Sequence, residues 1–198
     1  SGGSSQILAF VGGRYRVFGE TQDIALGNAL DTFAREAGIE GFPGAKRVEQ
    51  LALGGKYVQL PYTVKGTDLS FSGLVTHALE LHRSGRSLED LCFSIQEVSF
   101  SMLTEVAERA LAHTAKAELL LTGGVAANKR LRDMLATMCR ERPCRFSVVP
   151  FEYAMDNGAM IAWNGIQMYG AGATVEPAES HVKPRWRTDQ VVARWVKA

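Results

Sequence analysis

The sequence predicts an α/β protein of ordinary globular composition. Strands and helices alternate over residues 118–169, the pattern of strand–helix–strand units whose ligands bind beyond the carboxyl ends of the strands. Hydrophobic residues make up 46% of the 198 residues and charged residues 22%, close to the globular average. A chain of this length buries roughly 70% of the surface of its unfolded state, so its core needs no disulfide or metal.

The first half of the chain predicts a hairpin followed by helices. Apolar residues alternate with polar ones before and after the Gly12-Gly13 turn, and apolar positions then recur with helical spacing. The expected elements are strands 6–11 and 14–18, helices 24–37 and 48–53, a strand or extended loop over 56–72, and helix 73–82.

The second half contains the most regular element, a long helix. The segment Ser87-Leu88-Glu89-Asp90 resembles a capping box, and apolar residues follow at steps of three to five up to Leu111. Beyond it the expected elements are strand 118–121, helix 124–139, strand 145–149 and helix 157–169, then a polar, proline-bounded tail over 177–184 and an apolar stretch over 191–196.

Composition also excludes several classes of protein. The chain has 22 Lys and Arg against 21 Asp and Glu, so any nucleic acid would have to bind a local basic patch. Three cysteines, Cys92, Cys139 and Cys144, form no C-x-x-C pair, which argues against a secreted disulfide scaffold and a four-thiolate zinc site. No apolar run reaches the length of a membrane span. We therefore expect a soluble intracellular protein in a reducing compartment.

Two junctions between a strand and a helix are candidates for chemistry. At the first, Gly123-Gly124 follows a buried strand and precedes a helix, so unpaired N–H groups could face a nucleotide phosphate. The alternative is a tight, closely packed turn, with Asn128 as a surface residue of the first helical turn. At the second, Asp156 is interpreted either as an ordinary helix N-cap or as one hard oxygen ligand of a metal on a nucleotide.

Several motifs, taken in chain order, resemble the universal threonylcarbamoyladenosine tRNA-modification family. They are SGG (1–3), FGET (18–21), DIA (23–25), GN (27–28), LD (30–31), FAR (33–35), LSFSG (69–73), GGV (123–125) with Asn128, DNGAMIA (156–162) and RWRTD (185–189). The closest likeness is to the eukaryotic and archaeal branch, the catalytic subunit of the KEOPS complex. The sequence departs from the family's pattern at Ser4-Ser5, where the family has Asn-Thr, and in a spacing over 43–50 that is one residue longer.

The resemblance implies the ASKHA fold of actin, hexokinase and Hsp70, with residues 1–198 as a single carboxyl-terminal lobe of a two-lobe enzyme. Residues 38–115 would form a largely helical insert and 177–198 a tail. The family's His-x-x-x-His metal pair has no counterpart, because none of the four histidines lie four residues apart. The resemblance therefore implies that this chain alone is inactive.

The implied activity is transfer of a threonylcarbamoyl group from threonylcarbamoyl-AMP to N6 of the adenosine next to the anticodon, in tRNAs that read codons beginning with A. No side-chain nucleophile is required. The resemblance implies that substrate or nucleotide is bound by Ser1, Gly2, Gly3, Asp31, Gly44, Glu49 and Asn128. It also implies that Asp156 is a ligand of one divalent metal ion, which could be iron, zinc or magnesium. Other ligands of that ion would come from outside this chain.

The implied partners are tRNA, threonylcarbamoyl-AMP and the other KEOPS subunits, including its small protein kinase, in the cytoplasm or the nucleus and not at a membrane. Two alternatives stay open. One is a small-molecule kinase of the same fold, which also uses glycine turns and an acidic metal ligand; the other is a non-catalytic lobe that binds nucleotide or RNA.

The tail carries one further candidate site. Lys183, Arg185 and Arg187 surround Pro184 and Trp186, and cations interleaved with an aromatic ring can hold looped RNA by phosphate contacts and base stacking. The alternative is that Trp186 packs the tail onto the lobe while the arginines pair with surface carboxylates.

Overall fold

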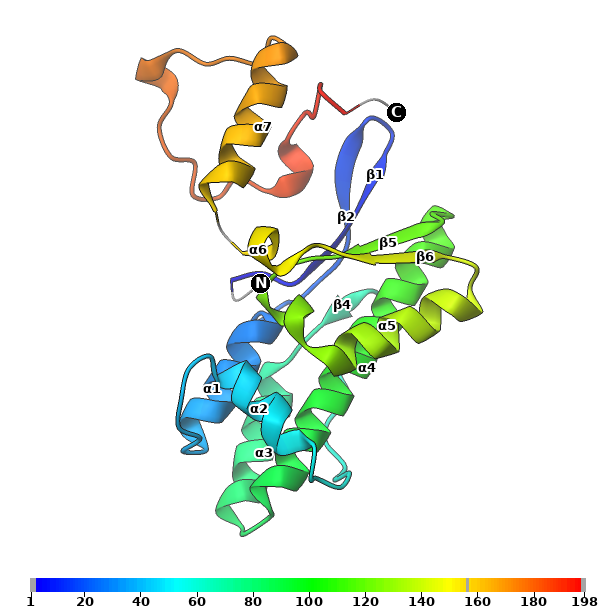
Figure 1. Cartoon of the computed structure of the whole chain (residues 1–198), viewed down its shortest axis with the longest axis vertical. Coiled ribbons are helices and arrows are strands. Elements are labelled where there is room, and N and C mark those ends of the chain that lie inside the picture. The colour runs from blue at the N-terminus through cyan, green and yellow to red at the C-terminus, as the bar shows by residue number, and fades with distance from the viewer. Residues whose placement is uncertain (1–2, 156, 197–198) are drawn as a thin grey trace.

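The computed structural model describes residues 3–155 and 157–196. A long helix, α4 (Leu88–Thr114), runs between a lower part made of α1 (Leu26–Glu36), α2 (Gly44–Ala52) and α3 (Ser72–Arg83) and an upper part that holds the amino-terminal hairpin and the carboxyl-terminal segments (Figure 1). Among the described residues no helix is both long enough and apolar enough to cross a membrane.

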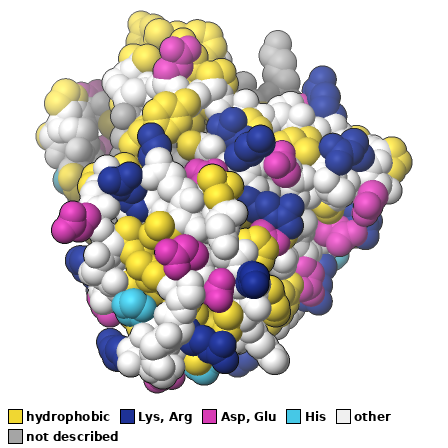
Figure 2. Space-filling model, turned by 60° about the horizontal axis from the view of Figure 1, so that its bottom comes forward, with side chains coloured by type: hydrophobic (Ala, Val, Ile, Leu, Met, Phe, Trp, Pro, Cys, Tyr) yellow, Lys and Arg dark blue, Asp and Glu magenta, His cyan; other side chains and the backbone are white. Residues whose placement is uncertain are grey.

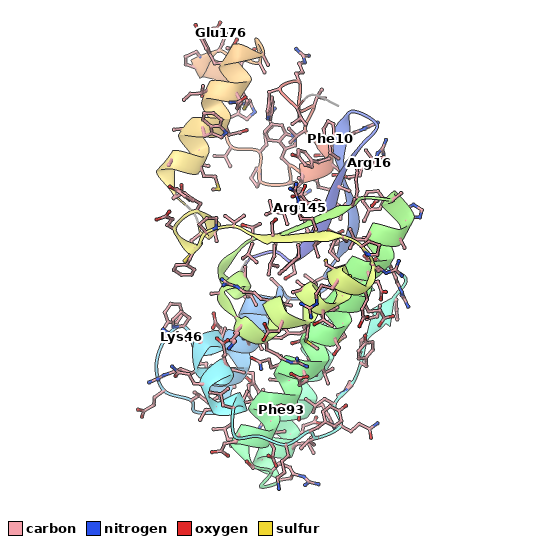
Figure 3. All side chains as sticks on the ribbon, turned by 45° about the vertical axis from the view of Figure 1, so that its right-hand side comes forward. Phe10, Arg16, Lys46, Phe93, Arg145 and Glu176 are labelled. Atoms are coloured by element: carbon pink, nitrogen blue, oxygen red, sulfur yellow. The ribbon has the colours of Figure 1, made fainter. Side chains whose placement is uncertain are left out.

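The strands of the described residues form three two-stranded sheets. The hairpin pairs β1 (Gln6–Val11) antiparallel with β2 (Arg14–Glu20), which runs two residues beyond the predicted strand. Its turn requires glycine, because Gly12 and Gly13 both have positive φ, 63° and 78°. Figure 3 shows the hairpin side chains Phe10 and Arg16 at the opposite end of the molecule from Phe93 of α4.

A strand–helix–strand unit confirms the predicted α/β class. Strands β5 (Glu118–Leu121) and β6 (Arg145–Val148) pair in parallel, and α5 (Lys129–Glu141) forms the crossover between them. The single helix predicted over 124–139 is nevertheless wrong. A 3₁₀ turn, η1 (Gly124–Ala127), comes first, and Asn128 then adopts an extended conformation before α5 begins.

The core lies where α4 meets α1, α2 and α3. Phe33, Phe71 and Phe100 have no exposed surface, and the apolar positions predicted on the long helix, such as Ile95 and Met102, are fully buried. The predicted cap of this helix is confirmed, because the Ser87 hydroxyl accepts a hydrogen bond from the Asp90 N–H at 3.3 Å.

Elements between 38 and 72 differ more from the prediction. Helix α2 begins at Gly44 rather than at 48, and the extended stretch over 56–72 contains only the short strands β3 (Val64–Lys65) and β4 (Asp68–Leu69). Helix α6 (Phe151–Ala154) is not predicted.

Two helices of the lower part begin at side chains from distant segments. Ser5, one of the two departures from the family pattern, accepts the Leu26 N–H of α1 on its hydroxyl at 2.9 Å. Asp23 accepts the N–H groups of Phe71 and Ser72 at the start of α3, at 2.9 and 3.0 Å. These contacts fix α1 and α3 against the amino-terminal segment.

The last helix is placed as predicted but is not part of the core. Helix α7 (Gly158–Gly170) begins with Asn157, whose side chain accepts the Met160 N–H at 2.8 Å, so the cap considered for Asp156 is supplied by Asn157. No described residue of α7 is buried, and Trp163 and Tyr169 are 64% and 77% exposed. The tail beyond α7 contains the short turns η2 (Pro177–Glu179) and η3 (Thr188–Gln190).

Candidate nucleotide site

Asp31 and Gly44, both predicted site residues, meet where α1 packs on α2. The Asp31 Oδ1 accepts the Ala45 N–H at 2.8 Å, and Pro43, the residue before the helix, contributes no side-chain cap. A carboxylate at this end of a helix is favourable, because the N-terminus carries partial positive charge. A Cβ on Gly44 would lie 2.7 Å from the Ala34 Cβ, so the approach of the two helices depends on glycine.

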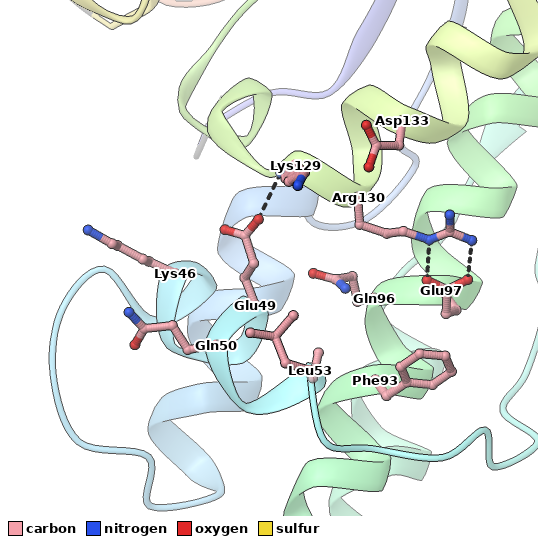
Figure 4. Close-up of a pocket in the computed structure, with 11 residues that line it drawn as sticks. Lys46, Glu49, Gln50, Leu53, Phe93, Gln96, Glu97, Lys129, Arg130 and Asp133 are labelled. Carbon is pink, nitrogen blue, oxygen red and sulfur yellow. Dashed lines mark hydrogen bonds and ion pairs between the residues drawn. The ribbon is translucent and has the colours of Figure 1, made fainter.

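Glu49 and Asn128 meet at the start of α5. The Glu49 Oε1 accepts the Lys129 N–H at 2.7 Å (Figure 4). The Asn128 Oδ1 accepts the Leu131 N–H at 3.1 Å. Protein groups thus satisfy two of the first N–H groups of α5, rather than leaving them all to a ligand. Asn128 is only 6% exposed, so its interpretation as a surface residue is wrong.

Gln96, a residue that no sequence motif singles out, supports this arrangement. Gln96 lies in the first half of α4 and is 5% exposed. Its Oε1 accepts a hydrogen bond from the Asn128 Nδ2 at 2.8 Å. A polar residue on the buried face of a long amphipathic helix is the signal that could have drawn attention to it.

Two of these residues, Glu49 and Gln96, border a groove of about 700 Å³ between α2, α4 and α5 (Figure 4). Glu49 and Gln96 line it together with Lys46, Leu53 and Phe93. On its other side Arg130 donates two hydrogen bonds to the Glu97 carboxylate, at 2.6 and 2.7 Å. The groove therefore offers apolar surface beside both signs of charge, as a site for a polar small molecule does.

A second cavity of about 400 Å³ lies at the carboxyl end of β5. It is lined by the segment that follows Gly3, by the Thr122-Gly123 turn, and by Met155 and Met160 on either side of the Asp156 position. Gly123 has φ 95°, a conformation that favours glycine. Gly3 itself is exposed, and Ser1, Gly2 and Asp156 lie outside the described residues.

The described residues offer neither a ready nucleophile nor a complete metal centre. Burial raises the pKa of the Cys92 thiol to about 12, and burial with a hydrogen bond to Cys144 raises that of Cys139 to about 11, so neither is a ready nucleophile. Within residues 3–155 and 157–196 no three His, Cys, Asp or Glu side chains gather as metal ligands would.

The fold defines the class of protein. The chain superimposes on HypF from T. kodakarensis with a TM-score of 0.57 over 74% of this chain and 20% of HypF, at 22% identity. A second HypF structure, in a phosphate- and nucleotide-bound form, gives 0.52 over 64% of this chain and 18% of that one, at 15% identity. The chain is thus an α/β protein with actin-like, ASKHA-type structural neighbours.

Sequence comparison then identifies the family. The profile described as tRNA N6-adenosine threonylcarbamoyltransferase matches residues 1–163, so the chain belongs to this family, and the predicted resemblance is confirmed. Enzymes of that name from Thermococcus sibiricus and Thermofilum pendens are 56% and 58% identical over 98% of this chain. The chain spans 60% and 58% of the lengths of these two relatives. A probable bifunctional tRNA threonylcarbamoyladenosine biosynthesis protein from Methanocaldococcus jannaschii is 53% identical, and the chain covers 37% of it.

Proposed function

We propose that this chain is the carboxyl-terminal, nucleotide-binding lobe of a tRNA N6-adenosine threonylcarbamoyltransferase. The observation that carries the proposal is the cavity at the end of β5. Its lining comes from or lies next to three family motifs, and its outermost lining residues, Ser4 and Met160, are 156 positions apart in the sequence. The substrates would be threonylcarbamoyl-AMP and tRNA. The family match gives no support to the small-molecule kinase or to a non-catalytic lobe.

The carboxylates of Asp31 and Glu49 suit the ribose of the adenylate. Each uses one oxygen to hold the first turn of a helix, Asp31 on α2 and Glu49 on α5. The other oxygen of each has no hydrogen-bond partner among the described residues, so it can accept a ribose hydroxyl without moving. Rigid acceptors of this kind bind a ligand with little loss of side-chain entropy.

The remaining proposed roles follow the family. Gly2 and Gly3 would offer backbone N–H groups to the adenylate, and Asn128, which stays in place by its bond to Gln96, would border the nucleotide at the start of α5. Transfer needs the N6 amine of adenosine held against the carbamoyl carbon, and positioning of this kind accounts for a large part of such catalysis. The amine displaces AMP directly, so no covalent intermediate on the chain is required.

Asp156 is proposed as one ligand of a divalent metal ion. The described residues do not complete a metal centre on their own, so the other ligands would come from outside them. We also propose other KEOPS subunits, including its protein kinase, as partners. The existence of bifunctional relatives, of which this chain covers 37%, is compatible with that assembly.

The test uses the full-length protein that carries this sequence. Asp156→Ala should abolish formation of threonylcarbamoyladenosine in tRNA and lower the bound metal, with little change in the melting temperature, because one hard oxygen ligand is lost. Modified nucleoside and metal content are measured by mass spectrometry. Glu176→Ala removes an exposed carboxylate and serves as the control. Near-normal modification in Asp156→Ala would remove this residue from the site.

A further inference from the structure

Arg185 and Arg187, which flank Trp186 in the tail, have different environments in the structure. Arg187 pairs with Glu20 at the end of β2, with 3.0 Å between its Nη2 and the Glu20 Oε1, and also lies 3.5 Å from Asp189. The hydrogen bond from Arg187 holds the pKa of Glu20 below its usual range. Ala193, 3% exposed, packs the following segment onto the protein. Arg187 and Ala193 therefore anchor the tail.

Lys183, Arg185 and Trp186 take no comparable part in packing. All three are exposed, and 56% of the Trp186 surface remains accessible, more than expected of a ring that holds the tail down. Within the described residues no hydrogen bond or ion pair involves the Arg185 guanidinium. The chain turns here, because the backbone N–H of Trp186 donates to the Lys183 carbonyl at 3.0 Å. In this turn the Lys183 Nζ lies 5.1 Å from the centroid of the indole ring, a cation–π contact.

Together with Pro184 and Gln190 these residues line a shallow hollow of about 400 Å³, to which no carboxylate contributes. Asp189, the nearest acid in sequence, faces Arg187 instead. The chain as a whole has a net charge of only +1, and Figure 2 shows Lys, Arg, Asp and Glu side chains interspersed on the lower part of the molecule. The hollow is thus a local site with two cations and one accessible aromatic ring.

We propose that this Lys183–Trp186 surface binds the tRNA substrate, with Lys183 and Arg185 on backbone phosphates and Trp186 against an unstacked base. Cations combined with an exposed indole match the charge and the π-face of looped RNA. This inference rests on the proposed transferase function and specifies, in addition, which surface of the chain binds the RNA. Arg187 is excluded from this surface, because its guanidinium is engaged by Glu20 and Asp189.

The experiment measures tRNA affinity of the full-length protein at several salt concentrations. Lys183→Glu with Arg185→Glu should weaken binding by at least tenfold and lower the slope of log K against log salt by about 1.4, since each lost phosphate contact on a single strand contributes about 0.7. Trp186→Ala should weaken binding about tenfold while Trp186→Phe keeps most of the affinity. Melting temperatures should not change, because these side chains are exposed.

Two controls separate charge from packing. Arg83→Glu with Arg86→Glu makes the same change of charge between α3 and α4, at the opposite end of the molecule, and should leave affinity within twofold (Figure 1). Arg187→Glu should lower the melting temperature, because it replaces the ion pair between Arg187 and Glu20 with two neighbouring carboxylates.

The outcomes distinguish this proposal from the proposed function. If the wild-type protein binds and modifies tRNA but the Lys183 and Arg185 double variant keeps the same affinity and slope, the surface proposal is overturned and the function stands. If the wild type neither prefers tRNA over polyuridine nor modifies it, the function itself fails. Loss of a protein partner with unchanged tRNA affinity would assign the hollow to protein binding and overturn the proposal.

Discussion

Gly44→Ala tests the packing that places Asp31 at the start of α2. The new Cβ would lie 2.7 Å from the Ala34 Cβ and 3.1 Å from both the Cα and the Oδ1 of Asp31, whereas carbon atoms in contact prefer about 3.5–4.0 Å. The Ala34 Cβ and the Asp31 Cα are fixed to the backbone of α1 and cannot rotate away. Helix α2 must therefore shift away from α1. Overpacking of this kind costs about 1–3 kcal/mol. Displacing the bond between Asp31 and the Ala45 N–H adds to that cost.

We expect the free energy of unfolding to fall by about 2 kcal/mol, which for a protein of this size lowers the melting temperature by roughly 4–8 °C. Urea unfolding followed by circular dichroism measures it. The matched control is Gly73→Ala in α3, where a Cβ would have no neighbour within 4 Å, and where the change should stabilise the helix by up to about 1 kcal/mol. If Gly44→Ala were as stable as Gly73→Ala, the close contact of α1 and α2 would be refuted.

Two further predictions concern side chains that begin helices. Partial burial raises the pKa of Asp23, but the N–H groups of Phe71, Ser72 and Ile24 outweigh it and the pKa lies below its usual value. The carboxylate therefore stabilises the fold above about pH 4, and this contribution is lost as the pH falls through the lowered pKa. In Asp23→Asn the free energy of unfolding should fall less steeply at acidic pH than in the wild type. An unchanged dependence of that free energy on pH would contradict the assignment. Asn128→Ala should lower the free energy of unfolding, measured with urea, by about 2–4 kcal/mol, because α5 loses its cap and the buried Gln96 Oε1 loses its donor. A decrease below about 0.5 kcal/mol would show that neither contact matters.

Part of the candidate site could be predicted from sequence and part could not. Asp31 and Asn128 stand out because they belong to motifs that carry the family resemblance. Gly44 and Glu49 are assigned by that resemblance although they lie where the spacing departs from the family pattern. The structure brings all four to the starts of α2 and α5. Gln96 belongs to no motif, and its contact with Asn128 joins residues 32 positions apart. Whether these residues bind a nucleotide stays a prediction.

The sequence by itself determined the elements whose signals are local. The periodicity and Ser87 cap of α4, the glycine turn of the hairpin and the order of β5, α5 and β6 all follow from neighbouring residues, because helical and strand patterns repeat within a few positions. The motifs determined the family in the same way, as short runs read in order.

Only the tertiary structure decided features that depend on distant partners. The helix predicted over 124–139 is interrupted at Asn128, where Gln96 of α4 and Glu49 of α2 supply hydrogen bonds that no local pattern contains. Helix α7 has the composition of a core helix yet buries no described residue. Arg185 and Arg187 are alike in sequence, but only Arg187 lies against Glu20, which is 167 positions away. In each case the outcome depends on what another segment of the chain places beside the residue.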